Sequence, residues 1–409
     1  MDPVRRRALG LLAAGALARA ADASPGAPPP ASAGAAADGS NASPGRGPAR
    51  FASGVRVGED RHALVVVDAE GRVLREDPLP GRAHGAAAHA GRGLSAVFAR
   101  RPGDWFALFD TAGDGAVRRV PVPASRRAGG HGAFSADGRW LHVVENDFDA
   151  ARGTLAVHDL ADRRAPRRVA EIPTGGVGPH DLLRVPGTDL YLVANGGIAT
   201  HPDTGREKLN LADMRPNVAL VRAAPGRRAE RLARWRLPET WHRVSLRHLA
   251  LDGAGRLWVG GQDEREPAER AGARAPLVAT AELADATAAP RRGAGTAPPP
   301  HSLALDPVDL PEDAHRALGG YVSSIDASGG AVAVTSSRGG SALLLDARSR
   351  TLRARLALGD CSGVAATDEP ELGWRLTNGR GEFVACDALG IEPRSVHRFA
   401  WDNHLTRIA

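Results

Sequence analysis

Short apolar runs alternate along this chain with turn-forming residues, as at 94–98, 140–144, 190–194 and 257–260. Each run is shorter than the 10 to 12 or so residues expected of a helix, and each suits a strand buried on both faces. The 49 glycines and 30 prolines supply frequent turns between such runs. The pattern therefore predicts an all-β chain of many short strands.

A phrase headed by histidine recurs before these runs. It reads His84-Gly-Ala-Ala-Ala, His131-Gly-Ala-Phe-Ser-Ala-Asp-Gly-Arg, His180-Asp-Leu-Leu and His248-Leu-Ala-Leu-Asp-Gly-Ala-Gly-Arg. A repeat of about 40 to 60 residues built from short strands is typical of a β-propeller. We therefore expect each repeat to be one four-stranded blade, whose strands A to D run from the channel outward.

The second repeat shows the expected blade most clearly, with strands over 131–135, 140–145, 153–159 and 168–173. Asp137-Gly138 supplies a hairpin turn between its first two strands. The same spacing gives six contiguous repeats, which begin near His84, His131, His180, His248, Tyr321 and Cys361.

The two ends of the chain predict a seventh blade. Residues 51–57, 62–68 and 72–78 look like strands B, C and D without an inner strand, and residues 401–408 look like a lone strand. Joining them pairs edges that would otherwise be exposed. We therefore expect a seven-bladed β-propeller over residues 49–409, similar in class to YVTN and WD40 repeats, with its last blade closed by N- and C-terminal strands.

Two stretches interrupt the repeat. Residues 196–216 form a long loop between strands B and C of the third blade, and long loops on rigid scaffolds often carry function. Residues 263–300 are rich in Ala, Arg, Pro and Gly with little pattern, and we expect part of this segment to be a disordered surface insertion.

The N-terminus carries an export signal. Arg5-Arg6-Arg7 precedes an apolar run over 8–18, and Ala18-Arg19-Ala20 resembles a cleavage site, so residues 1–22 are interpreted as a signal peptide, plausibly of the twin-arginine type. The apolar run is shorter than the 20 or so residues that span a membrane, although an uncleaved anchor is the alternative. Residues 23–48 form a Pro/Ala/Gly/Ser linker expected to be disordered. We expect a periplasmic protein without a membrane span once the signal is removed.

Charge and cysteine content add limits. The 53 basic residues include a single lysine, Lys208, and form no long basic tract, which argues against nucleic-acid binding despite a net charge of +6. The two cysteines, Cys361 and Cys386, lie in one expected blade on strands that should not be neighbours. An exported protein could pair them, and the sequence leaves that question open.

The inner ends of the blades should gather polar side chains at one channel mouth, since the start of strand A and the end of strand B meet on the same rim. Candidate metal ligands are His84, His131, Glu145, His180, His248 and His404. Candidate rim residues that bind a ligand are Arg100, Arg101, Asn146, Asp147, Asn195, His201, Asp203, Arg247, Gln262, Arg338 and Asn378.

Histidine suits a metal site because neutral imidazole ligates transition metals and titrates near neutral pH. Glu145, Asp147 and Cys361 could complete a coordination sphere, with iron or copper as the expected ion. His201 and Asp203 could cap the site from the long loop. The alternative is structural, with each histidine bonding to a neighbouring blade.

The combination of phrases resembles the bacterial domain-of-unknown-function 1513 family. The phrases are His131-Gly-Ala-Phe-Ser-Ala-Asp-Gly-Arg, Glu145-Asn-Asp-Phe-Asp, Gly178-Pro-His-Asp, Ala194-Asn-Gly-Gly-Ile, His201-Pro-Asp-Thr-Gly-Arg, Asn210-Leu-Ala-Asp-Met-Arg-Pro, Arg247-His-Leu, Ser336-Ser-Arg-Gly-Gly and Trp401-Asp-Asn-His. The resemblance runs from about residue 51 to 408. It implies a periplasmic seven-bladed propeller and a genomic setting beside imelysin-like and di-haem peroxidase-like proteins, which are possible partners in iron uptake. It implies no catalytic residues, and Asn378 stands where serine is expected.

Three functions follow as hypotheses. The first is a non-enzymatic protein that binds a metal, a metal complex or a partner at the histidine-rimmed mouth, in support of iron acquisition. The second is a lactonase-like or other metal-assisted hydrolase with Glu145 as general base, although the chain has no Gly-x-Ser-x-Gly, His-Glu-x-x-His or Cys-x-x-Cys-His motif. The third is an interaction scaffold with structural histidines.

Overall fold

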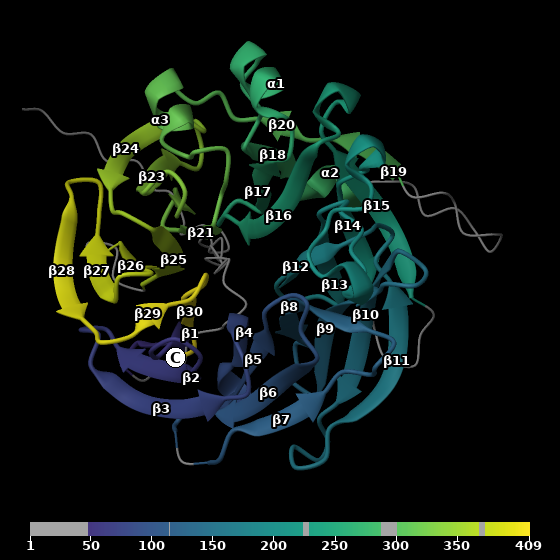
Figure 1. The fold of residues 1–409 in the computed structure, drawn as a ribbon, viewed down its shortest axis with the longest axis vertical. Coiled ribbons are helices and arrows are strands. Elements are labelled where there is room, and N and C mark those ends of the chain that lie inside the picture. The colour runs from purple at the N-terminus through teal and green to yellow at the C-terminus, as the bar shows by residue number, and fades with distance from the viewer. Residues whose placement is uncertain (1–47, 114, 224–228, 288–300, 368–372) are drawn as a thin grey trace, which may run out of the picture. The chain divides into compact units, whose positions relative to one another are not determined.

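The computed structural model describes residues 48–113, 115–223, 229–287, 301–367 and 373–409. The expected signal peptide lies outside the described residues, as does the expected linker apart from its last residue, Pro48. The described chain forms seven sheets arranged around one centre as a β-propeller, which confirms the predicted fold class (Figure 1).

Six of the sheets match the six predicted repeats, and four of these six contain consecutive strands only. The first sheet contains β4 (Ala83–His89), β5 (Leu94–Ala99), β6 (Trp105–Asp110) and β7 (Arg118–Pro121). The second contains β8 (Arg127–Phe134), β9 (Trp140–Asp147), β10 (Arg152–Asp159) and β11 (Arg167–Pro173). The third contains β12 (Pro179–Arg184), β13 (Leu190–Asn195), β14 (Asn217–Arg222) and β15 (Glu230–Arg236).

The next three sheets follow the same order from the centre outward. They are β16 (Val244–Leu251), β17 (Arg256–Asp263), β18 (Val278–Glu282), β20 (Asp306–Pro307); β21 (Ser324–Ser328), β22 (Ala331–Ser336), β23 (Ser341–Asp346), β24 (Leu352–Ala357); and β25 (Cys361–Ala366), β26 (Trp374–Asn378), β27 (Glu382–Cys386), β28 (Ile391–Val396).

The seventh sheet combines both ends of the described chain. It contains β1 (Arg50–Arg56), β2 (His62–Asp68) and β3 (Val73–Leu79), and β1 also pairs with two short strands, β29 (Ala400–Trp401) and β30 (Thr406–Arg407). Ile408, which follows β30, is fully buried among apolar residues of the first and seventh sheets. The segment between β29 and β30 therefore lies on the channel side of the ring.

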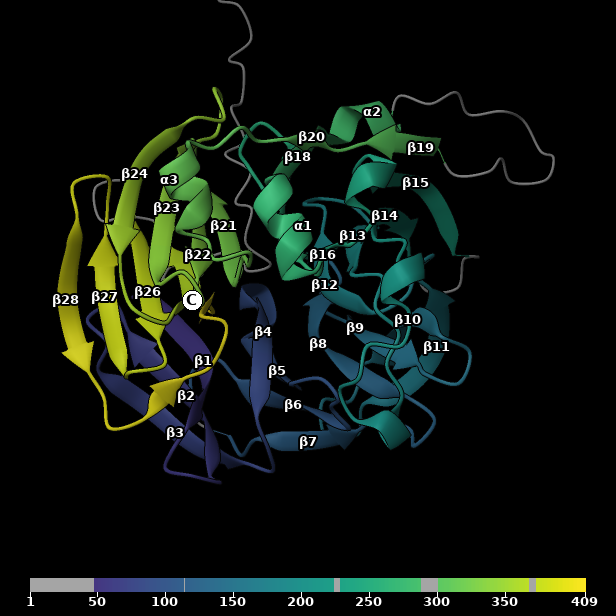
Figure 2. The ribbon, with the colours of Figure 1, turned by 45° about the horizontal axis from the view of Figure 1, so that its top comes forward.

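The segment expected to contain a disordered insertion has regular elements in its first part. Residues 263–287 carry α1 (Pro267–Gly272), the third strand of the fourth sheet, β18, and α2 (Leu283–Thr287), while 288–300 lie outside the described residues. The short strand Val278–Glu282 is hard to detect in the sequence, because the residues around it are mostly Ala, Arg and Pro. In the structure it pairs with β17, and Val278 and Ala279 are buried. Figure 2 shows α1 beside this sheet and α3 (Glu312–Arg316) beside the next.

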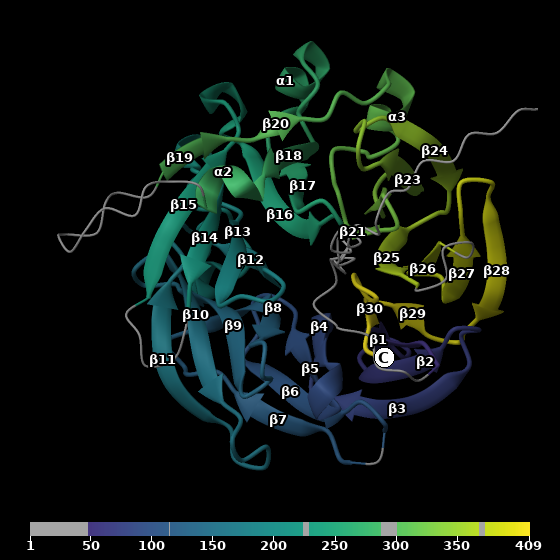
Figure 3. The ribbon, with the colours of Figure 1, turned by 180° about the vertical axis from the view of Figure 1, so that it is seen from behind.

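After the undescribed segment, the chain adds a strand to the third sheet. β19 (His301–Ala304) runs parallel to β15, as the reverse view shows (Figure 3). The sheets pack through apolar faces, and Trp235 of the third sheet and Trp258 of the fourth are almost fully buried. Among the described residues, no helix is long and apolar enough to cross a membrane.

Both cysteines are free thiols. Cys361 lies on β25 and Cys386 on β27, with β26 between them, so they occupy non-adjacent strands as the sequence predicts. Burial raises the pKa of the Cys386 thiol to about 12 and also raises that of Cys361. Both thiols are therefore protonated and unreactive at neutral pH.

The packing of the C-terminal segment can be tested at Ile408, which is fully buried. We expect Ile408→Ala to lower the free energy of unfolding by about 2–5 kcal/mol, because it leaves a cavity between two blades. Chemical denaturation measures the change. Leu389→Ala is the control, since that side chain is 94% exposed and should change stability by less than about 0.5 kcal/mol. Equal stability of the two variants would contradict this packing.

Candidate metal centre

Five histidines meet in the central channel, each supplied by a different sheet. His84, His131, His180 and His248 lie on the innermost strands β4, β8, β12 and β16, and His404 lies between β29 and β30. Between the rings that contact one another, the centroid distances run from 4.5 Å, for His84 and His404, to 6.0 Å, for His131 and His248. Side chains up to 320 positions apart thus form one cluster, which we call the histidine cluster.

The inner strands turn these rings inward by interrupting their pairing at the same level. The register with the second strand shifts between Ala83 and Ala86 in β4, and between Pro179 and Asp181 in β12. Equivalent shifts occur in β8, between 128 and 132, and in β16, between 246 and 248. Such bulges bend a strand and redirect its side chains, so each blade can aim its histidine at the axis.

Two glycines make room for the rings. A Cβ atom on Gly85 would lie 2.7 Å from Nδ1 of His131, and one on Gly130 would lie 2.5 Å from Cδ2 of His84. Gly130 also has a φ of +108°, which other residues adopt only under strain. The His-Gly and Gly-His pairs of the first two repeats are therefore steric requirements for the cluster.

Burial keeps all five imidazoles neutral. Their exposed fractions range from 1% for His248 to 9% for His131. Loss of solvent lowers the pKa of each ring, to about 3 for His131, and other positive groups nearby lower it further, including Arg247 for His131 and His180. Each ring therefore offers a lone pair at neutral pH, as a metal ligand must.

The ring nitrogens have fewer hydrogen-bond partners than burial normally demands. Nδ1 of His131 lies 3.2 Å from Oδ1 of Asp181, Nδ1 of His404 lies 3.0 Å from Oγ of Ser324, and Nε2 of His84 lies 3.3 Å from Nε2 of His180. Six ring nitrogens have no partner: Nδ1 of His84, Nε2 of His131, Nδ1 of His180, both nitrogens of His248 and Nε2 of His404. Each unpaired buried group costs about 1–3 kcal/mol, so six in one place suggest an occupant.

The spacing of the ring nitrogens is close to what a metal ion requires. One ligand nitrogen from each of His84, His131, His180 and His404 lies within 4.8 Å of all the others. A tetrahedral ion with metal–nitrogen bonds of about 2.0–2.1 Å separates its ligands by about 3.4 Å. The 3.3 Å between Nε2 of His84 and of His180 already matches that separation. Small movements of the other rings would complete the set.

Asp181 is a site residue that the sequence reasoning missed. Its side chain accepts hydrogen bonds from the backbone N–H of Leu182, at 2.7 Å, and of Leu249, at 2.9 Å, which fixes it beside His131. A carboxylate on Nδ1 orients a ligating histidine and makes it more basic. The signal was present in the sequence, because Asp181 directly follows His180.

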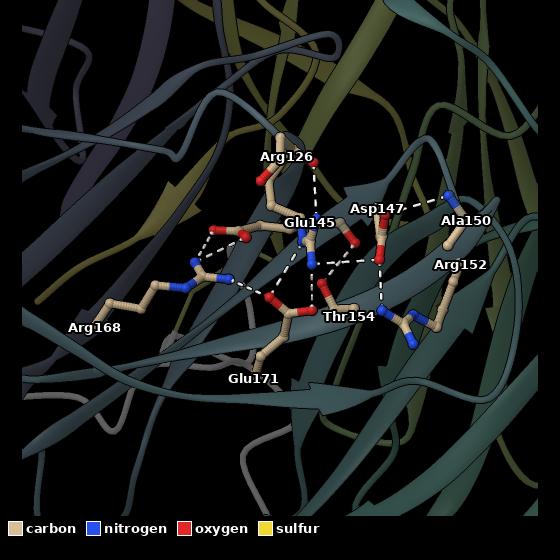
Figure 4. Close-up of polar contacts among 9 residues, drawn as sticks. Arg126, Glu145, Asp147, Ala150, Arg152, Thr154, Arg168 and Glu171 are labelled. Carbon is tan, nitrogen blue, oxygen red and sulfur yellow. Dashed lines mark hydrogen bonds and ion pairs between the residues drawn. The ribbon is translucent and has the colours of Figure 1, made fainter.

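Glu145 is not part of the cluster, which corrects the prediction that it ligates the metal. Figure 4 shows its carboxylate held by the guanidinium of Arg168, at 2.9 Å from each oxygen. Arg168 and Arg126 also bind Glu171, at 2.8 and 2.9 Å. Asp147 lies in the same network, 3.3 Å from Arg126 and ion-paired with Arg152. These carboxylates are neutralised within the second sheet.

The remaining candidates divide into two groups. Arg100, Arg101, Arg247, Gln262 and Arg338 line one cavity of about 550 Å³. The others have local partners instead of lining that cavity.

Among the others, Asn195 is fully buried and bonds to Thr174 and Asn217, and Asn378 binds Gly359 and Glu382. Asn146 is largely buried within its sheet. His201 lies 3.4 Å from Asp149 and 3.5 Å from Asp203 on the long loop.

The histidine cluster lies inside the channel, with a cavity on either side, and this differs from the predicted position at the mouth. Residues just before the histidines, such as Arg82, Arg247 and Asn403, line the 550 Å³ cavity. Residues just after them, such as Gly85 and Leu249, line a cavity of about 100 Å³ that His131, His248 and His404 also reach. The cluster is thus a layer between the two.

Comparison with known proteins gives one family match. The model described as "Protein of unknown function (DUF1513)" matches residues 77–408. No curated protein matches the sequence.

Several solved structures are similar in fold at low identity. They are apo AztD from Citrobacter koseri (11% identity, 88% of this chain and 99% of that chain, TM-score 0.44), a chain of the mitotic checkpoint complex (10%, 75% and 76%, 0.47) and Kuenenia stuttgartiensis hydrazine synthase (14%, 72% and 77%, 0.41). At TM-scores below 0.5, these likenesses support no functional inference.

The lowered pKa values of the histidine cluster predict how stability varies with pH. Unfolded histidine binds protons below about pH 6.5, whereas the folded rings resist protonation to far lower pH, to about 3 for His131. The contribution is fully present above about pH 6.5 and is lost as the pH falls, by up to about 1.4 kcal/mol per pH unit for each ring. We expect His248→Leu to flatten the slope by about one proton, as measured by denaturation between pH 5 and 8.

The control for this experiment is His242→Leu, because His242 lies outside the cluster and is partly exposed. That variant should keep the slope of the original protein. If the free energy of unfolding is constant between pH 5 and 6.5, the neutral buried state of the cluster is contradicted.

Proposed function

This chain belongs to the DUF1513 family of proteins of unknown function, and we propose that it is a non-enzymatic binding protein for a transition-metal ion. The ion would bind in the histidine cluster, within the central channel. The N-terminal Arg5-Arg6-Arg7 and the apolar run after it support export to the periplasm.

One observation carries the proposal: five buried, neutral histidines in mutual contact leave six ring nitrogens without a partner, and four of these rings each offer a nitrogen within 4.8 Å of the others. Other buried histidines also leave ring nitrogens without a partner: His142 bonds to the carbonyl of Ala223 through Nε2, at 3.1 Å, but its Nδ1 has no partner. His158 has none, but it packs against Phe106 away from the cluster. The cluster differs because its five rings contact one another, whereas those of His142 and His158 are isolated from it.

The scaffold hypothesis explains the cluster less well. Neutral rings packed only for shape could be replaced by apolar side chains without loss, whereas these five leave six polar atoms unsatisfied. A metal ion would satisfy several of them at once. The hydrolase hypothesis loses its proposed base, because Arg168 holds the carboxylate of Glu145.

The donor set favours a borderline metal. Imidazole nitrogen suits copper, zinc, iron and nickel, and divalent ions usually bind such sites in an order that peaks at copper. No carboxylate joins the four-histidine set, so the donors favour copper or zinc in binding strength. The iron-uptake setting implied by the family resemblance remains part of the proposal, with metal supply deciding which ion is bound.

Metal titration tests the proposal directly. Protein freed of metal by chelation and desalting is titrated with Cu²⁺, Zn²⁺ and Fe²⁺ (the last without oxygen) in a calorimeter. We expect one equivalent to bind the original protein, and His131→Ala/His180→Ala/His404→Ala to weaken binding by at least about 100-fold, because three imidazole bonds are lost.

A matched triple variant provides the control for this titration. His89→Ala/His242→Ala/His315→Ala removes the same number of histidines from partly exposed positions outside the cluster. It should bind like the original protein. If both triple variants bind the same ion with the same affinity, the site lies elsewhere and the proposal fails.

Asp181 supplies a second test. We expect Asp181→Asn to weaken metal binding by about 10–100-fold, because the carboxylate no longer orients His131. Asp326→Asn is the matched control: Asp326 accepts the same kind of backbone bonds, from Ala327 and Ala366, in the fifth sheet. Equal metal affinity of the two variants would exclude a supporting role for Asp181.

A further inference from the structure

The larger channel cavity has a strongly basic lining. Its volume, about 550 Å³, lies within the range of small-molecule sites, about 300–1,000 Å³. The lining contains eight positively charged side chains: Arg56, Arg82, Arg100, Arg101, Arg206, Lys208, Arg247 and Arg338. Arg206 and Lys208 come from the long loop after β13, so a distant segment adds charge to the channel.

Acidic groups balance only part of this charge. The lining holds three carboxylates, and two of them are in ion pairs, Asp402 with Arg82 and Glu264 with Lys208. The third carboxylate, that of Asp360, is in none of the ion pairs of the described residues. Among the ion pairs of the described residues, none involves the other six guanidinium groups, which are those of Arg56, Arg100, Arg101, Arg206, Arg247 and Arg338.

One of these six guanidinium groups, that of Arg247, is buried in the channel wall, and those of Arg100 and Arg101 are partly buried. Arg247 is 9% exposed, and its Nε has no hydrogen-bond partner. Burial and the nearby charges of Arg247 and Arg206 lower the pKa of Arg101 to about 9, and burial with Arg82 lowers that of Arg100 to about 10. Arg100 and Arg101 therefore stay charged at neutral pH, and a buried charge without a counter-ion is costly.

The neighbouring polar groups could orient a bound molecule. Arg338 lies over the ring of Tyr321, 4.9 Å from its centroid, which restrains the guanidinium at the rim. Gln262 and Ser337 add side-chain amide and hydroxyl groups to the same lining. The cavity thus combines fixed positive charge with neutral hydrogen-bonding groups.

We propose that this cavity binds a small oxyanion that carries two or more negative charges on carboxylate or phosphate groups. Arginine forks match both groups in a bidentate geometry, and several forks around one cavity favour an anion with several charged groups. The charge of this anion site comes from the arginines and does not require a metal ion in the histidine cluster.

The position of the cavity adds a second step. Arg247 and Asn403 in its lining directly precede His248 and His404, so a bound anion lies next to the histidine cluster. A cation in the cluster would face Arg247, and an anion between them offsets that repulsion. This step, which rests on the proposed function, makes a metal–polycarboxylate complex the natural occupant of the channel.

Calorimetry on metal-free protein tests the anion site, with tricarballylate, inorganic phosphate and acetate as probes. We expect tricarballylate or phosphate to bind at least 100-fold more tightly than acetate. Arg247→Gln and Arg338→Gln should each weaken that binding by about tenfold or more, the effect of losing one charge-assisted contact. Arg338 is exposed, so its replacement should leave folding intact.

Arg118→Gln is the control, because Arg118 is exposed on β7 outside the cavity, and it should change the affinity less than twofold. Binding of acetate as tight as that of tricarballylate, or equal affinities in all three arginine variants, would overturn the inference. Tricarballylate binding that persists in the His131/His180/His404 triple variant supports the anion site even if metal binding fails. Its loss there, with an unchanged circular dichroism spectrum, would contradict a site built on the arginines.

Discussion

The account depends on the burial of five imidazoles against one another at the axis of a closed ring of sheets. No single blade can form this contact, because five blades contribute one ring each, and His404 comes from the segment that pairs with β1. Burial excludes water and keeps the rings neutral, which leaves their lone pairs free. The same burial leaves ring nitrogens without hydrogen-bond partners, which costs free energy. A ligand that binds to these nitrogens would therefore stabilise the protein.

The surroundings of the cluster divide the channel by charge. On one side, Asp181 and Ser324 hold two of the rings through their Nδ1 atoms, and both residues reach the smaller cavity. On the other side, arginines from five or more separate segments surround the larger cavity. The proposed cation site and the proposed anion site therefore lie next to each other along one axis. This arrangement suits a neutral or anionic metal complex better than a bare ion.

Much of this could be predicted from the sequence. The recurring histidine before an apolar run located the inner strand of four blades, and closure of the ring then brings their imidazoles together at the axis. Arg100, Arg101, Arg247, Gln262 and Arg338 line the larger cavity together, and their place at strand ends that share one rim can be counted from the repeat. The glycines next to His84 and His131 are also explained by the structure, because a Cβ atom on Gly85 or Gly130 would collide with a histidine ring of the cluster.

Other features could not be predicted, and the reasons are physical. Glu145 ends a second strand like the rim residues, but Arg168 from the outermost strand of its own sheet neutralises it, and strand pairing of that kind is invisible in a linear pattern. The bulges that set the depth of the histidines are shifts of register, which composition does not reveal. Arg206 and Lys208 reach the cavity through the path of a long loop, which no periodicity describes.

X-ray absorption spectroscopy of the metal-loaded protein tests the central claim most directly. The account predicts a first shell of nitrogen atoms at about 2.0–2.1 Å, with the multiple-scattering signature of several imidazole rings. A first shell of water or carboxylate oxygen without imidazole scattering would contradict it.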